Sequence, residues 1–213
     1  MTHPKHKEFP LVHVHRILVF VVLLLLSVPN SVLASPQENA KTLVQQNYTS
    51  IEKLVRTSKD SEALSEKITG VLDALIDWDS FSSKTLSTGT WNDLETAQKE
   101  SFKQSYRKLI VRRYAKRFKA GVKFRVEFRE VATDAKNKGV WVYTTVHSNE
   151  GKRRLGIDVD YEFWKGEKGH RVADIVTDGV SRARSYRPKF KRILRTRGFD
   201  ALIGAIERNA KRR

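Results

Sequence analysis

The chain has 213 residues, of which 39% are hydrophobic, and its 41 Lys and Arg residues against 24 Asp and Glu give a formal net charge of +17. This composition excludes a disordered or low-complexity chain and leaves room for one compact domain with a sizeable core. The positive charge favours an anionic partner: a nucleic acid, an acidic lipid surface or an acidic protein.

The first 34 residues have the pattern of a secretory signal peptide. Basic residues up to Arg16 precede the uncharged run Ile17–Val28, and small residues precede a predicted cleavage point after Ala34. The run is shorter than the roughly 20 residues that a transmembrane helix needs, and an uncleaved membrane anchor is the alternative interpretation. An exported protein rarely meets nucleic acid, so we predict no nucleic-acid partner. Because cysteine is absent, a packed core has to stabilise the remaining single domain, residues 35–213, without disulfides.

Helical periodicity dominates the first half of this domain. Apolar residues at spacings of 3 and 4 predict amphipathic helices over residues 39–58 and 61–75. A short helical turn is expected over 77–86, and a long helix with basic outer faces over 93–120. Gly121, which is typical of a helix C-terminus, is expected to end it.

After Gly121 the apolar period changes from 3.6 to 2, which is typical of strands. Four strands are predicted over residues 122–130, 140–147, 154–164 and 171–177, joined by short turns. Consecutive strands with short turns form an antiparallel meander. With helices before and after it, the sheet predicts an α+β domain with a curved, four-stranded antiparallel sheet.

Bulky side chains line the face of the sheet that is expected to be buried. The strands contribute Phe124, Phe128, Tyr161 and Phe163 with Trp141 or Tyr143, and the long helix offers Phe102, Tyr106, Tyr114 and Phe118. Two such apolar faces either interdigitate into a solid core or stand apart around a cavity. The pattern alone leaves both outcomes open.

No established catalytic motif occurs in the chain, which lacks a phosphate-binding loop, a nucleophile elbow and a zinc-protease helix. Asp158 and Asp160 form the one carboxylate pair that could perform acid–base chemistry if it were enclosed. They alternate with the buried set, so we expect them to face solvent or the basic helix ends. The sequence therefore predicts neither an enzyme nor a metal site.

The C-terminal third carries a set of short motifs in a characteristic order and spacing. They are Val159-Asp160-Tyr161, Asp174-Ile175, Asp178-Gly179-Val180-Ser181, Tyr186-Arg187, Phe190, Gly198 and Leu202-Ile203. Together they resemble the MlaC-type phospholipid-binding proteins of the toluene-tolerance family, over roughly residues 38–210. The chain departs from the family pattern at Ser82–Thr85, where an apolar residue and an arginine are usual.

The resemblance implies a periplasmic lipid carrier, exported by the signal peptide, whose curved sheet and covering helices enclose phospholipid acyl chains. It implies three partners: phospholipid as cargo, an inner-membrane ABC lipid-transport complex and an outer-membrane lipoprotein complex. It implies no cofactor besides the bound phospholipid. The residues expected to form the cavity wall are Phe102, Tyr106, Leu109, Tyr114, Phe124, Val126, Phe128, Tyr143, Ile157, Val159, Tyr161, Tyr186 and Phe190. Arg182, Arg184 and Arg187 are expected to meet the headgroup or a docking partner.

Three alternatives stay open at this point. A basic periplasmic protein with a packed core could dock on anionic membranes or polymers. A carrier of the same family could take a hopanoid lipid, since a related branch accompanies this polycyclic cargo. A hydrolase would require an enclosed Asp158/Asp160 pair.

Overall fold

The computed structural model describes residues 34–134, 139–150, 153–166 and 169–211. The apolar run of the predicted signal peptide lies outside these ranges. Within them, no helix combines the length and the apolar character that a membrane crossing requires.

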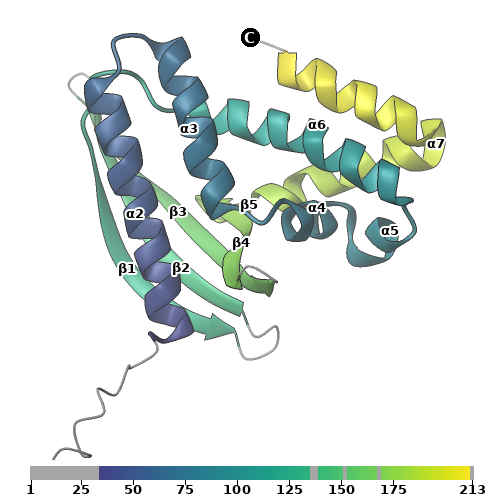
Figure 1. Ribbon diagram of the computed structural model, residues 1–213, viewed down its shortest axis with the longest axis horizontal. Helices are drawn as coiled ribbons and strands as arrows, with labels where there is room; N and C mark the ends of the chain where they lie inside the picture. The colour runs from purple at the N-terminus through teal and green to yellow at the C-terminus, as the bar shows by residue number, and fades with distance from the viewer. Residues whose placement is uncertain (1–33, 135–138, 151–152, 167–168, 212–213) are drawn as a thin grey trace, which may run out of the picture. The chain divides into compact units, whose positions relative to one another are not determined.

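Helices precede and follow one antiparallel sheet, as Figure 1 shows. The helices are α2 (Pro36–Thr57), α3 (Ser61–Leu75), α4 (Trp78–Leu86), α5 (Thr88–Asn92), α6 (Thr96–Ala115) and α7 (Arg182–Lys211). The strands are β1 (Phe124–Asp134), β2 (Gly139–Glu150), β3 (Arg153–Gly166), β4 (Gly169–Thr177) and β5 (Val180–Ser181), and they pair in chain order. The predicted α+β class and antiparallel meander are confirmed, with a short fifth strand added at the edge.

The predicted long helix is shorter than expected, ending at Ala115 instead of Ala120. Turn bonds replace helical ones there: the Arg117 amide donates to Tyr114 O at 2.9 Å and the Phe118 amide to Ala115 O at 3.1 Å. The Gly121 amide then donates to Val55 O of α2 at 3.0 Å. A contact with a distant helix therefore holds the turn after α6, and local periodicity does not encode this contact.

The spacing of Tyr186, Phe190, Ile193 and Leu194 predicts a last helix over Tyr186–Thr196. The helix begins four residues earlier, at Arg182, because the preceding sheet caps it. Asp174 Oδ1 on β4 accepts from the Ala183 amide at 3.1 Å, and Ser181 Oγ accepts from the Arg184 amide at 3.0 Å. These bonds satisfy amides that have no partner inside a helix. Gly198, which the sequence predicts as the end of this first helical segment, interrupts α7 with φ of 81°.

A buried lysine connects α4 to the sheet. The Lys84 ammonium pairs with Glu162 of β3 and lies 3.6 Å from Asp174 Oδ2 of β4. All three residues are less than 10% exposed. Trp164 Nε1 donates to Glu162 Oε1 at 2.8 Å, and the ammonium lies 5.1 Å from the centre of its ring. This Lys84 cluster is the main polar element in the core.

Two glycine substitutions should have opposite effects on stability. Gly198 has φ of 81° and ψ of 179°, a conformation that residues with a Cβ rarely adopt, so Gly198→Ala should lower the free energy of unfolding by about 1–3 kcal/mol. Gly70 lies inside α3 with open space around its α-carbon, so Gly70→Ala should raise that free energy by about 0.5–1 kcal/mol. Urea denaturation of both variants measures the difference, and equal effects would contradict the assigned role of Gly198.

Candidate functional site

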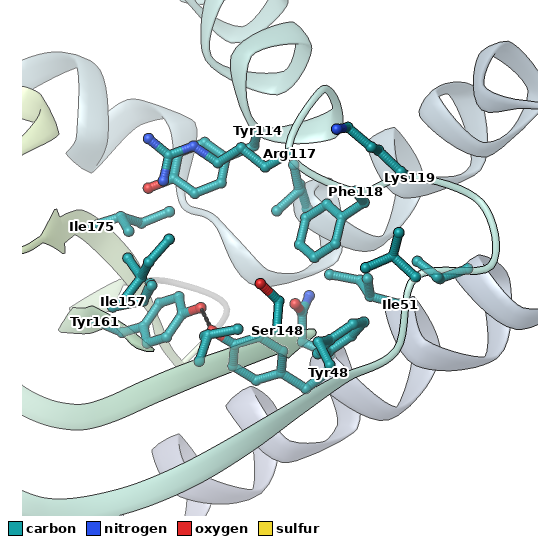
Figure 2. A pocket seen from close by; sticks show the side chains of 17 residues that line it. Tyr48, Ile51, Tyr114, Arg117, Phe118, Lys119, Ser148, Ile157, Tyr161 and Ile175 are labelled. Atoms are coloured by element: carbon teal, nitrogen blue, oxygen red, sulfur yellow. Dashed lines mark hydrogen bonds between the residues drawn. The ribbon is translucent and has the colours of Figure 1, made fainter. Parts of the chain in front are cut away.

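An apolar pocket of about 110 Å³ lies between the sheet and the helical layer. Figure 2 shows its side chains converging from both layers. The helical side consists of Asn47, Tyr48, Ile51, Val55, Leu72, Tyr114, Arg117, Phe118, Lys119 and Val122, and the sheet side of Phe124, Val146, Ser148, Ile157, Val159, Tyr161 and Ile175.

Strand alternation explains which sheet residues reach the pocket. Successive side chains of a strand point to opposite faces, so Ile157, Val159 and Tyr161 of β3 share the pocket face. The register pairs Val146 with Ile157 and Ile175 with Tyr161. Three neighbouring strands therefore present one continuous apolar surface to α2.

Two tyrosines form the polar contact within this wall. The Tyr161 hydroxyl donates to the Tyr48 hydroxyl at 2.6 Å, joining β3 to α2, as the dashed line in Figure 2 marks. Burial raises the pKa of Tyr48 to about 12 and the pKa of Tyr161 well above its usual value. Both phenols therefore remain neutral at physiological pH, and the wall carries no charge at this point.

Cationic side chains lie at the helical side of the pocket. The Arg117 guanidinium carbon is 5.4 Å from the centre of the Tyr114 ring, and the two side chains lie together in Figure 2. Arg117 and Lys119 are both exposed to solvent while contributing to the lining. The pocket thus combines an apolar interior with a basic margin.

The predicted wall residues separate into those at the pocket and those elsewhere. At the pocket are Tyr114, Phe124, Ile157, Val159 and Tyr161. Val126 and Phe128 line a neighbouring hollow of about 380 Å³ between α2 and β1.

The orientation expected for Tyr143 is corrected by the strand register. Val142 and Thr144 are buried on the helical side of β2, so Tyr143 points to the other face. There it stacks on Trp141 with ring centres 5.8 Å apart. The strand is apolar on both faces, so its sequence could not tell which face is covered.

The other predicted aromatics form a second, solid part of the core between α4, α6 and α7. Tyr106 is its centre, with ring centres 5.4 Å from Phe102, 5.6 Å from Tyr186 and 5.8 Å from Phe190. Leu109, also on α6, is 1% exposed in the core. None of these residues contributes to the described pocket lining.

The three predicted arginines have different environments. Arg187 donates to the carbonyl oxygens of Lys84 and Thr85, and so ties α7 to the end of α4. Arg184 is exposed, whereas Arg182 is half-buried with its Nε enclosed. The structure therefore brings one of the three, Arg182, close to buried groups beside the pocket.

Sequence reasoning missed the contribution of α2. Tyr48, Ile51 and Val55 line the pocket from this helix, and their spacing of 3 and 4 did place them on its apolar stripe. That stripe also contains Val44 and Ala40, which are fully buried. Periodicity identifies the stripe but not the part of it that faces a pocket.

The carboxylate pair Asp158/Asp160 lies on the face of β3 opposite the pocket, where it is held by an arginine from β1, two strands away in the sheet. Arg129 of β1 contacts Asp160 Oδ1 at 2.7 Å and Asp158 Oδ2 at 3.5 Å. Burial raises the pKa of Asp160, an effect that Arg129 partly offsets. Among the described residues, no group of three His, Cys, Asp or Glu side chains could hold a metal ion. Of the two expected surroundings, solvent or the basic helix ends, Asp158 meets solvent, since its side chain is 43% exposed. The ionic partner of the pair is a strand arginine and not a helix end.

A larger hollow of about 700 Å³ near the start of α4 has charged side chains in its lining. Its carboxylates already have partners: Asp73 accepts from Arg107 Nε at 2.7 Å, Asp79 from Lys103 Nζ at 3.2 Å, and Asp77 from the amides that begin α4. These contacts hold the helices in place, so the carboxylates of the hollow have a structural role and are not a binding site for a ligand.

Helices that cover one antiparallel sheet over an apolar pocket define the class of small α+β proteins able to hold an apolar ligand. The family model described as MlaC protein matches residues 33–208, and the chain belongs to this family. Among solved structures, a phospholipid-binding protein from Ralstonia solanacearum, determined in complex with a phospholipid, has a similar fold. The TM-score is 0.68 at 16% sequence identity, covering 80% of this chain and 96% of that one. No curated protein sequence matches significantly.

Proposed function

We propose that this chain is a periplasmic lipid carrier that binds phospholipid acyl chains between β1–β4 and α2. The observation that carries the proposal is the apolar pocket, in a chain of the MlaC family whose structural neighbour was solved with a phospholipid. Transfer of acyl chains from water contributes about 0.8 kcal/mol per methylene. Binding alone therefore supplies ample affinity, and the proposal requires no catalytic step.

The pocket has to widen to take an acyl chain. Cavities of about 150 Å³ accept a benzene-sized molecule, and this pocket measures about 110 Å³. The segment from Lys116 to Val122 lines one side and is held by turn bonds outside any regular element. Its displacement away from the sheet would enlarge the pocket without breaking a strand ladder.

Family membership also supports the wider role, in which the carrier exchanges lipid with an inner-membrane ABC lipid-transport complex and an outer-membrane lipoprotein complex. The direct test is native mass spectrometry of the purified protein, before and after incubation with liposomes. We expect a stoichiometric lipid adduct. Protein that carries no lipid and acquires none would contradict the proposal, and steeply salt-dependent vesicle binding without an internal lipid would favour a basic surface-binding protein. A bound polycyclic lipid would instead identify a hopanoid carrier.

A further inference from the structure

Three buried polar groups from three separate elements lie together beside the pocket, with no side-chain hydrogen-bond partner outside their own cluster among the described residues. They are Tyr114 Oη on α6, Thr177 Oγ1 on β4 and Arg182 Nε at the start of α7. Tyr114 is 8% exposed and Thr177 is 3% exposed. Groups that pair only with one another leave donors unused, and a buried donor left unsatisfied costs about 1–3 kcal/mol. This position therefore favours a ligand that supplies hydrogen-bond acceptors.

Positive charge surrounds the same place. Burial raises the pKa of Tyr114, and this rise is partly offset by side-chain hydrogen bonds with Thr177 and Arg182 and by the positive charges of Arg117 and Arg182. The phenol therefore stays protonated and able to donate. Among the described residues, neither Arg117 nor Arg182 forms an ion pair with a carboxylate. Two guanidinium groups are thus available next to two hydroxyl groups.

This set of groups fits one ligand chemistry. Guanidinium forks and hydroxyl donors match the oxygens of a phosphate, and the adjoining pocket is apolar. An amphipathic phosphate with hydrocarbon tails satisfies both halves of the site. A headgroup amine would place a third positive charge beside the two arginines, which is unfavourable.

We propose that Arg117 and Arg182, with the hydroxyls of Tyr114 and Thr177, form a headgroup phosphate subsite that selects net-anionic phospholipids. The subsite rests on the proposed function and adds a preference for phosphatidylglycerol over phosphatidylethanolamine. Arg117 and Tyr114 bring the subsite to the margin of the pocket in Figure 2. Arg182 reaches the same place from the start of α7. Of the three arginines predicted to meet the headgroup, it is the one that we assign to the subsite.

The test uses delipidated protein and vesicles of equimolar phosphatidylglycerol and phosphatidylethanolamine, with bound lipid extracted and quantified by mass spectrometry. We expect the unmodified protein to enrich phosphatidylglycerol about tenfold, equivalent to about 1.4 kcal/mol. The double variant Arg117→Gln with Arg182→Gln should return to the vesicle ratio while binding the same total lipid. The matched control, Arg192→Gln with Arg195→Gln, removes equal charge from exposed positions of α7 and should keep the enrichment.

Equal enrichment in the double variant and its control would overturn the subsite, as would a vesicle-like lipid ratio in the unmodified protein. Both results leave lipid carriage intact, because total bound lipid is measured separately. Absence of any bound lipid would overturn the proposed function and the subsite together. If the double variant unfolds, Arg117→Gln alone decides the matter, since the Arg117 side chain is exposed and its loss removes no buried group.

Discussion

Val146→Trp is expected to reduce phospholipid uptake from liposomes by about two orders of magnitude. Val146 lines the pocket from β2 opposite Ile157, so an indole ring there occupies space that acyl chains would take. The pocket volume of about 110 Å³ holds roughly four methylene-sized groups, if each takes about the 30 Å³ that one water molecule occupies in the liquid. Excluding four methylenes at about 0.8 kcal/mol each removes about 3 kcal/mol, which is roughly a hundredfold in affinity. Native mass spectrometry of liposome-treated protein measures the loss.

The matched control is His147→Trp, one residue further along β2. His147 points to the opposite sheet face, where its Nε2 lies 3.1 Å from Glu127 Oε2. The same bulk added there should leave uptake unchanged, and thermal denaturation should find both variants folded. Undiminished uptake by Val146→Trp would show that the cargo lies elsewhere in the domain.

The class of fold was predictable because each element carries its own period. The amphipathic stripe of α2 and the alternation in β1 and β3 both specify a buried face without reference to the rest of the chain. Boundaries were less predictable where distant residues decide them. Asp174 moves the start of α7, and the bond from Gly121 to Val55 fixes the turn after α6.

The candidate site was predictable only in part, for a related reason. An aromatic residue on a buried face contributes to a solid core or to a pocket according to what packs against it. Tyr106 meets four other rings and is completely buried, whereas the ring centre of Phe124 lies 6.2 Å from that of Tyr48 at the edge of the pocket. The solid core and the pocket wall are built from the same residue types. Only the placement of α2 and α7 decides which of the two an aromatic residue joins.

Lys84→Met is expected to lower the free energy of unfolding by about 3–5 kcal/mol, the largest stability effect that we predict. The substitution keeps most of the side-chain volume but leaves Glu162 and Asp174 buried without the ammonium that lies between them. Their other contacts, from Trp164, Ser181 and the Ala183 amide, satisfy single oxygens and carry no positive charge. Urea denaturation at neutral pH measures the loss.

Lys103→Met provides the matched control, because this lysine also pairs with two carboxylates but at the surface. Its nitrogen lies 2.8 Å from Glu100 and 3.2 Å from Asp79, whose side chains are 51% and 64% exposed. Exposed pairs contribute about 0–1 kcal/mol, so the two lysine variants should differ severalfold. Adding Glu162→Gln to Lys84→Met should recover part of the loss, since one buried negative charge is then removed. Equal losses for the two lysines, or no recovery in the double variant, would show that packing of the Lys84 stem, and not its charge, holds α4 against β3 and β4.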